Sequence, residues 1–205
     1  MSRHRSTRAR RQPGARSAKP PLRGLSQAQP LRGLPPIAGR RVHTLILGSL
    51  PGVASLEACE YYDHPRNGFW DAAESLGIAR SLPYRSRCAR LKHLGFALWD
   101  VLAECERMGS LDQAIRAPRP NDLPVFAGLH PELRSIWLNG AAAQRYFARF
   151  ALAPPGVSWR TLPSTNPANT ARHKLAVWRR AFRGAARRAH ADSPERVLAR
   201  RFGAA

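Results

Sequence analysis

A short, largely apolar run over residues 42–47 stops abruptly at residues 48–52, Gly-Ser-Leu-Pro-Gly, and this break constrains the fold more than any other feature of the chain. Apolar runs of this length that end at Gly and Pro are typical of buried strands followed by tight loops. The same reasoning predicts strands over residues 133–138 and 157–162, and a strand or the turn beside one over residues 95–101. The loop after the first strand is where chemistry is expected.

Helical patterns separate these apolar runs. They cover residues 69–76, 86–94, 121–129, 141–150 and 171–189, and capping-box spacing predicts a short helix from Ser110. Strands that alternate with helices form a mostly parallel sheet with helices on both faces. Ligands bind such sheets at the carboxyl ends of the strands. We therefore expect the loops after Leu47 and Leu162 to lie side by side.

The charge of the chain is concentrated at its two ends. Net charge is +21; residues 1–40 hold ten Lys or Arg and no acid, and residues 171–205 hold ten against two acids. Such an excess points to a polyanionic partner. Residues 1–38 contain too few apolar side chains to offset the entropy of ordering, so we expect a disordered basic arm there, one folded domain over residues 39–190 and a basic tail over residues 191–205. The arm either holds phosphates nonspecifically or is a solvated tail.

The three cysteines, Cys59, Cys88 and Cys105, are widely spaced and form no Cys-x-x-Cys pair. Neither a disulfide framework nor a zinc or iron–sulfur site is predicted, and a reduced, cytoplasmic compartment fits best. No apolar run is long enough to cross a bilayer, and the N-terminal region lacks the apolar segment of a secretory signal. We expect no membrane association, no metal and no cofactor.

Polar and aromatic side chains are unusually dense over residues 61–70. The residues concerned are Tyr62, His64, Asn67 and Phe69. As a group they are too polar for core alone and too aromatic for a plain connector, so we interpret the segment as half of a nucleobase pocket. Each has a structural alternative: Asn67 can cap the following helix, His64 can be a hydrogen-bonded structural group, and Tyr62 and Phe69 can belong to the core.

Four segments taken together resemble the uracil-DNA glycosylase superfamily. They are Gly48-Ser49-Leu50-Pro51-Gly52, the His-Pro-x-Asn-x-Phe-Trp pattern at residues 64–70, Gly-Phe-Ala-Leu-Trp-Asp-Val at residues 95–101, and Leu-Pro-Ser-Thr-Asn-Pro-Ala-Asn at residues 162–169. The resemblance spans about residues 42–183 and is closest to the hypoxanthine (deoxyinosine) DNA glycosylase branch. It implies an α/β fold, a three-layer α/β/α sandwich with a small, mostly parallel four-stranded central sheet.

The resemblance also implies the chemistry of the site. Members of the superfamily flip a damaged base out of the duplex and hydrolyse its N-glycosidic bond. Their first loop often supplies a carboxylate or amide that positions the water, but this chain has Ser49 there and no acid. That departure matches the hypoxanthine branch, whose important polar group is the Asn of the His-Pro-x-Asn pattern, here Asn67. Tyr62 and Phe69 become candidates to stack on the flipped base. The expected base pocket comprises Gly48, Ser49, Pro51, Gly52, Tyr62, His64 and Phe69.

Residues 163–169 resemble the intercalation loop of the superfamily, which enters the minor groove and grips the phosphates beside the flipped nucleotide. Hydroxyls and backbone amides suit phosphate oxygens, and Ala168 or its neighbours would occupy the vacated space. The branch usually has Ser where this chain has Asn166, which leaves the exact contacts open. A Pro-rich strand-to-helix turn is a structural interpretation compatible with the same role. The expected DNA-binding residues are Ser164, Thr165, Asn166, Ala168 and Asn169.

The sequence therefore predicts a DNA repair glycosylase that excises hypoxanthine, with uracil as a second candidate base. Lys92 and Lys174 are the only lysines of the expected domain and neither adjoins a pocket motif, so we expect hydrolysis without a lyase step. The expected partner is double- or single-stranded DNA with deaminated bases, bound by a monomer in the cytoplasm. Two alternatives remain open: a uracil or G:U mismatch-specific glycosylase, and a noncatalytic basic module that binds nucleic acid.

Overall fold

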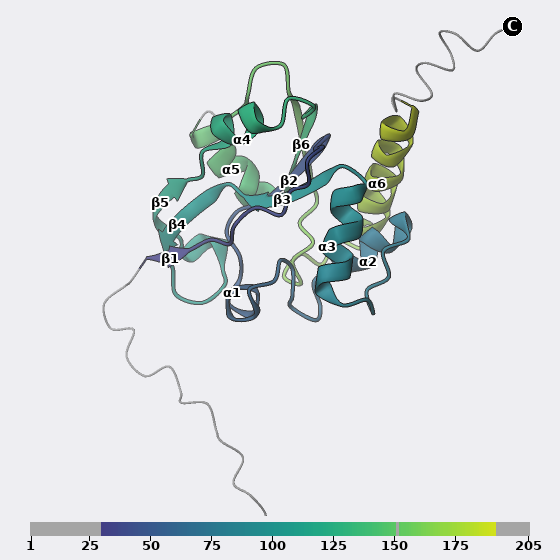
Figure 1. The fold of residues 1–205 in the computed structure, drawn as a ribbon. Coiled ribbons are helices and arrows are strands. Elements are labelled where there is room, and N and C mark those ends of the chain that lie inside the picture. The colour runs from purple at the N-terminus through teal and green to yellow at the C-terminus, as the bar shows by residue number, and fades with distance from the viewer. Residues whose placement is uncertain (1–29, 151, 192–205) are drawn as a thin grey trace, which may run out of the picture.

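The computed structural model describes residues 30–150 and 152–191 (Figure 1). Residues 1–29 and 192–205, which hold most of the expected basic arm and tail, lie outside the described residues. The disorder predicted for residues 1–29 and the basic tail predicted at the C-terminal end therefore stay predictions. Within the described part, no helix is both long and apolar enough to span a membrane.

A four-stranded parallel sheet forms the centre of the molecule (Figure 1). Its strands stand in the order β3 (Phe96–Asp100), β2 (Thr44–Gly48), β6 (Ser135–Asn139) and β7 (Ser158–Leu162). All three pairings are parallel. The four predicted strands are confirmed. The segment over residues 95–101, for which a strand and a turn were both open, contains the strand β3. Because the strands are parallel, their carboxyl ends meet at one edge of the sheet, where the site is expected.

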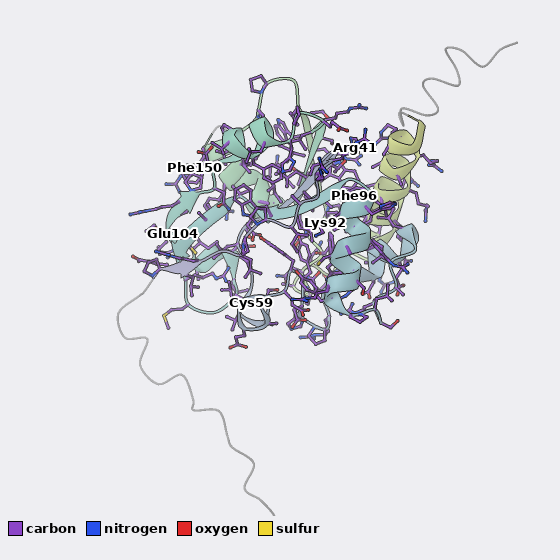
Figure 2. All side chains as sticks on the ribbon, in the orientation of Figure 1. Arg41, Cys59, Lys92, Phe96, Glu104 and Phe150 are labelled. Carbon is purple, nitrogen blue, oxygen red and sulfur yellow. The ribbon has the colours of Figure 1, made fainter. Side chains whose placement is uncertain are left out.

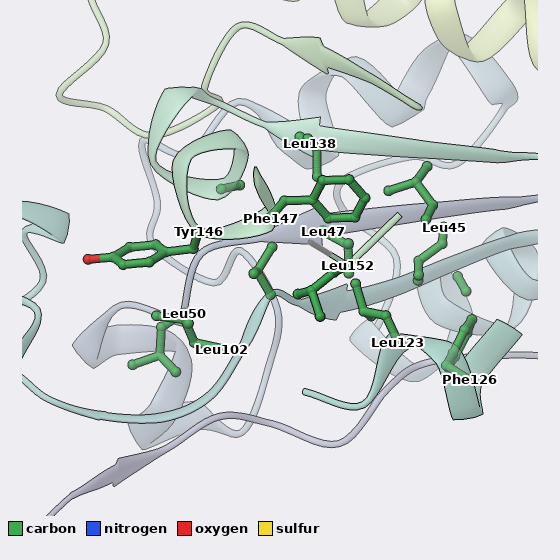
Figure 3. Close-up of a cluster of buried hydrophobic side chains, with 14 of the residues drawn as sticks. Leu45, Leu47, Leu50, Leu102, Leu123, Phe126, Leu138, Tyr146, Phe147 and Leu152 are labelled. Carbon is green, nitrogen blue, oxygen red and sulfur yellow. The ribbon is translucent and has the colours of Figure 1, made fainter. Parts of the chain in front are cut away.

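One face of the sheet is covered by α4 (Leu123–Leu129) and α5 (Ala141–Arg149), both at the predicted places. Asp122 caps α4, since its side chain accepts a hydrogen bond from Val125 N. Side chains of β2 and β6 alternate between the two faces, as a strand requires. The buried side chains on this face, drawn in Figure 3, include Leu45, Leu47, Leu123, Phe126, Leu138 and Phe147.

The opposite face carries α2 (Phe69–Ala73) with the 3-10 turn η1 (Glu74–Leu76), α3 (Tyr84–His93) and α6 (Lys174–Ala191). The last two start within three residues of their predicted beginnings. This layer is rich in fully buried aromatic side chains, of which Phe96 is labelled in Figure 2: Phe69, Trp70, Phe96, Trp137, Trp178 and Phe182. Helices on both faces of a parallel sheet confirm the predicted three-layer α/β/α sandwich.

A second, antiparallel sheet was not predicted. It consists of β1 (Leu31–Arg32), β4 (Leu102–Glu106) and β5 (Arg116–Pro120). The expectation that the disordered arm reaches residue 38 is wrong for residues 30–38, because Leu31–Arg32 pair with β4 and Ile37 bridges Leu98. The composition of this segment suggested disorder, but its backbone groups find partners on strands distant in sequence.

Two short helical segments differ from the prediction. Residues 53–58 form α1 (Val53–Ala58), directly after the first loop, where no helix was expected. The short helix predicted from Ser110 is a 3-10 turn, η2 (Asp112–Ala114). The three cysteines are free thiols, and Cys59, labelled in Figure 2, is exposed at the end of α1.

Candidate active site

A pocket of about 300 Å³ opens at the carboxyl ends of β2, β3 and β6. Gly68 N donates to Thr165 O at 3.0 Å, which joins the segment before α2 to the loop after β7. The pocket is lined by residues 48–55, 61–62, 110–112 and 164–167 together with His64, Asn67, Asp100 and Asn139. The loops after β2 and β7 therefore do lie side by side, and the space between them suits a nucleobase with a water molecule beside it.

The backbone of loop 48–52 is tightly fixed. Gly48 ends β2 where a Cβ atom would collide with Asp100 Oδ1, so a larger residue here would displace the Asp100 carboxyl. Leu102 N donates to Ser49 O at 3.0 Å, which continues the contact beyond the end of the sheet. The predicted pocket residues Gly48, Ser49, Pro51 and Gly52 all line the pocket.

A second loop, residues 107–112, is bound to loop 48–52 and to the start of α1. The bonds run from Arg107 Nη2 to Pro51 O, from Val53 N to Ser110 Oγ at 2.9 Å, and from Ser49 Oγ to Asp112 Oδ1 at 2.5 Å. Two segments distant in sequence thus form one wall of the pocket. Neither can shift without breaking hydrogen bonds to the other.

Tyr62 lines the pocket, and Phe69 lies behind it. The Tyr62 and Phe69 rings stack with centroids 4.1 Å apart and an interplanar angle of 23°. Phe69 is fully buried and also packs edge-on against Trp178 and Phe182. The prediction that Phe69 lines the base pocket is therefore wrong: its place is in the core, because the aromatic layer under α2 and α6 surrounds it. Tyr62 does line the pocket, and its stacking on a base stays a prediction.

Tyr62 also has an unusual backbone. Its φ of 60° is in the left-handed region, which costs a non-glycine residue about 1–3 kcal/mol and persists only where the surroundings impose it. Its hydroxyl is buried and has no hydrogen-bond partner among the described residues. Burial raises the pKa of this phenol, and the carboxyl of Asp100 adds to that rise. Backbone strain of this kind is often found at ligand sites.

Asn67 stabilises the start of α2 and also lines the pocket, but the N-cap of α2 is Gly68, so the interpretation of Asn67 as the cap is wrong by one residue. Its Oδ1 accepts a hydrogen bond from Phe69 N at 3.0 Å, at the start of α2. This bond fixes the two ends of the amide, because only oxygen can accept from a backbone N–H. The NH2 end is then the group available to a ligand in the pocket that Asn67 lines. The side chain is only 9% exposed, so its orientation is well constrained.

His64 lines the pocket beside Asn67. Its Nδ1 accepts a hydrogen bond from Arg66 N at 3.1 Å. An accepting Nδ1 places the ring proton on Nε2, so Nε2 is a donor. His64 is therefore held by its own loop and presents a donor, which agrees with both interpretations of this residue.

The loop after β7 is stabilised by its own side chains. Asn166 Oδ1 accepts from Ala168 N at 2.9 Å, and Asn169 Nδ2 donates to Ser164 O at 2.8 Å. Lys174 Nζ donates to the carbonyls of Asn166 and Asn169, at 3.0 and 2.6 Å. Of the predicted DNA-binding residues, Ser164, Thr165 and Asn166 line the pocket, whereas Ala168 and Asn169 do not. Their contacts with DNA stay predictions.

The contacts of Thr165 are structural and differ from the predicted phosphate contact. Its side chain is fully buried and its hydroxyl accepts from Asn139 Nδ2 at 2.9 Å, while its N–H donates to Asn139 Oδ1 at 2.9 Å. A fully buried hydroxyl cannot reach a phosphate, so this part of the prediction is wrong. The reciprocal pair instead ties the loop to the end of β6. Close packing supports the tie, since a Cβ at Gly140, whose φ is 98°, would lie 2.7 Å from Ser164 Cβ.

Two carboxylates and an amide in the pocket were missed by the sequence analysis: Asp100, Asp112 and Asn139. Asp100 and Asn139 are the last residues of β3 and β6, so a search at the carboxyl ends of predicted strands would have found them. Asp112 had no such signal, because only the pairing of loop 107–112 with loop 48–52 brings it to the site.

Asp100 is the most deeply buried carboxyl of the site, at 3% exposure. Among the described residues its Oδ2 has no hydrogen-bond partner. Burial raises the pKa of Asp100 to about 8, with Asp112 adding to the rise and Arg107 opposing it. At neutral pH this group is therefore mostly protonated, and it can donate a hydrogen bond.

Asp100→Asn should stabilise the protein relative to wild type at alkaline pH. Asp100 ionises near its ordinary value of 3.8 when unfolded and near 8 when folded, so between these values the folded state binds the extra proton. Wild-type stability then falls as pH rises through this window, by up to about 1.4 kcal/mol per pH unit, and asparagine does not titrate. Urea unfolding of both proteins from about pH 5 to about pH 9 should show a difference that widens in favour of the variant. A difference that stays constant with pH would contradict it.

Among known proteins, no family model matches the chain, but individual relatives do. Two relatives, both named hypoxanthine DNA glycosylase, come from Methanosarcina barkeri and Methanosarcina acetivorans. They are 31% and 33% identical over 156 residues, which are 74% of this chain and 98% of each relative. A solution NMR structure from Methanosarcina acetivorans, provisionally named a uracil DNA glycosylase, superposes with a TM-score of 0.68 and 31% identity, over 77% of this chain and 99% of that one.

Proposed function

This chain belongs to the hypoxanthine DNA glycosylase branch of the uracil-DNA glycosylase superfamily, and on that premise we propose that it removes deaminated bases, hypoxanthine foremost, from DNA by hydrolysing the N-glycosidic bond. Its substrate is DNA. The reaction develops positive charge on the sugar and negative charge on the departing base. It therefore calls for a dry pocket, a donor to the base and an oriented water.

The observation that carries the proposal is the orientation of the Asn67 amide. Its oxygen is held by Phe69 N, which leaves the NH2 group to a ligand in the pocket. Adenine carries an amino donor at the position where its deaminated product carries a carbonyl acceptor. An NH2 group can therefore donate a hydrogen bond to the carbonyl of hypoxanthine at this position, whereas the amino group of adenine cannot accept one. Guanine has the same oxygen, but flipping costs least for a mispaired base, which protects guanine in normal pairs.

The rigidity of the walls supports base flipping. Loop 48–52 is bound to loop 107–112, and the loop after β7 is bound to β6 and α6. Unstacking a base costs a few kcal/mol, which contacts with the DNA must offset. Preformed loops lose little entropy on binding, so more of that contact energy is available for flipping.

A panel of duplexes that each contain one deaminated base tests this function. We expect single-turnover release of hypoxanthine to be faster than release of uracil or xanthine. Release of uracil alone would favour the uracil or G:U mismatch-specific alternative. Binding of all duplexes with release of no base would favour the noncatalytic alternative.

The abasic product should remain uncleaved until alkali is added. A lyase step needs a free amine to form a Schiff base with the sugar. Lys92, labelled in Figure 2, lies on α3 and is not among the residues that line the pocket, and Lys174 Nζ already donates to two carbonyls. Gel electrophoresis with and without alkali checks this, and borohydride trapping of a protein–DNA adduct would contradict it.

The finer points of binding are part of the same proposal. We expect a monomer that acts in the cytoplasm on double- or single-stranded DNA, with the excess of positive charge supplying phosphate contacts. Binding should weaken steeply as salt is raised, since each neutralised phosphate releases counterions.

A further inference from the structure

Hydrolysis needs a water molecule held near the sugar, and the family resemblance leaves the group that holds it unassigned. Loop 48–52 contains no acidic residue. Of the residues that line the pocket, two are carboxylates, Asp100 and Asp112. An ionised acceptor suits this water best, because it can also stabilise the positive charge that develops on the sugar.

The two carboxylates differ in their suitability. Asp100 is almost completely buried, and its raised pKa keeps it protonated at neutral pH. Asp112 is partly exposed at the pocket wall, where solvent can stabilise its charge. Two acids of a site with such different surroundings are commonly divided between a neutral role and an ionised role.

Asp112 is also fixed in place. Its Oδ1 accepts the Ser49 hydroxyl across 63 residues of sequence, and Ser49 is itself only 9% exposed. Ser49 stands at the position where related enzymes often carry the acidic or amide residue. The loop that bears Asp112 is further held by Arg107 on Pro51 and by Val53 on Ser110. With Oδ1 used by Ser49, Oδ2 is the oxygen left for a water molecule.

We propose that Asp112 is the catalytic carboxylate that holds and deprotonates the hydrolytic water, and that Ser49 is its positioning residue. The inference rests on the proposed function. In this step the water oxygen forms a bond to C1′ of the sugar while the bond from C1′ to the base nitrogen breaks and its electron pair leaves with the base. The proton lost by the water goes to Asp112 and then to solvent, and the base takes up one proton from solvent. The missing acid of the first loop is thus supplied by a different loop.

The test measures single-turnover excision of hypoxanthine from a duplex at saturating enzyme, with DNA affinity measured separately. Asp112→Asn and Asp112→Ala should each lower the rate by about 10²–10⁴-fold with affinity changed no more than a few-fold. Ser49→Ala should lower the rate by about tenfold, since the carboxylate remains but is less well held. Asp122→Asn, which alters the capping carboxylate of α4 away from the pocket, is the matched control and should leave the rate unchanged.

Chemical rescue separates a catalytic role from a structural one. Added formate should restore part of the rate of Asp112→Ala and leave that of Asp112→Asn unchanged, because only the smaller side chain leaves room for a carboxylate. Active wild type with a nearly unchanged rate in both Asp112 variants would overturn this inference and leave the proposed function standing. A slow Asp112→Ala that formate does not rescue would also overturn it. Wild type that releases no hypoxanthine would overturn the proposed function, and this inference with it.

Discussion

Asn67→Asp should lower the single-turnover rate of hypoxanthine release by about 10²–10³-fold, the cost of removing one donor that stabilises developing charge. The variant retains an oxygen that accepts from Phe69 N, so the hydrogen bond at the start of α2 stays in place. The variant loses the NH2 group. In its place stands a negatively charged oxygen, which would repel the oxygen of the base. Rapid-quench measurements at saturating enzyme give the rate.

Asn67→Ala is the companion variant, since it removes both the NH2 donor and the oxygen that accepts from Phe69 N. It should lose excision to a similar extent and also lose about 1 kcal/mol of stability, a typical value for one hydrogen bond. DNA affinity of both variants should stay within a few-fold of wild type. If Asn67→Asp excised hypoxanthine at the wild-type rate, the amide donor would have no role in catalysis and Asn67 would only stabilise the start of α2.

Trp178→Ala should lower the free energy of unfolding by about 3–5 kcal/mol, the range for large aromatic side chains removed from a core. Trp178 is fully buried, and its ring lies 5.8, 6.2 and 5.5 Å from those of Phe69, Trp137 and Phe182. Its Nε1 donates to Pro163 O at 2.7 Å, so it also holds the start of the loop after β7. Core stability and loop geometry therefore depend on the same side chain.

Trp178→Phe divides these two roles. It keeps most of the aromatic packing and removes the donor to Pro163, so it should cost less stability than Trp178→Ala but still weaken DNA binding. Trp159→Ala is the control, since Trp159 is 45% exposed on β7 and should cost far less than Trp178. Urea unfolding followed by circular dichroism measures all three. Equal losses for Trp159→Ala and Trp178→Ala would contradict the account of the core.

The central sheet was predictable chiefly from β2, β3 and β6, in which apolar residues predominate, whereas β7 is more polar and carries a weaker signal. The antiparallel sheet was not, because its strands carry weaker signals. Arg116–Pro120 contains two prolines and two arginines, and Leu31–Arg32 is too short for any periodicity. These strands form only because β4 offers them a partner, and such pairing over long sequence separations leaves no local pattern.

The site was predictable in so far as its residues follow the first and last strands. Asn67 and loop 48–52 were found from their dense, unusual composition, and they do line the pocket. Phe69 was misplaced because an aromatic residue beside a pocket and one behind it have the same local sequence. Asp112 was missed because hydrogen bonds to a distant loop, rather than its neighbours in sequence, bring it to the wall.

Loop 48–52 lacks an acid, but loop 107–112 brings the carboxylate of Asp112 to it. Under the proposal this carboxylate takes the place of the missing acid in hydrolysis. The Ser49 hydroxyl is too weak a base to take a proton from the water, but it can donate a hydrogen bond that positions a carboxylate. In the proposed mechanism Asn67 is the donor to the base and Asp112 is the acceptor for the water. Asp100, which is mostly protonated at neutral pH, adds little competing negative charge.

The most direct test of the central claim is to identify the base released by the wild-type protein from a duplex that contains deoxyinosine. Under single-turnover conditions, mass spectrometry should detect free hypoxanthine in an amount equal to the abasic sites formed, and the matched adenine duplex should release no base. Absence of free hypoxanthine, with the protein folded and bound to the duplex, would contradict the account.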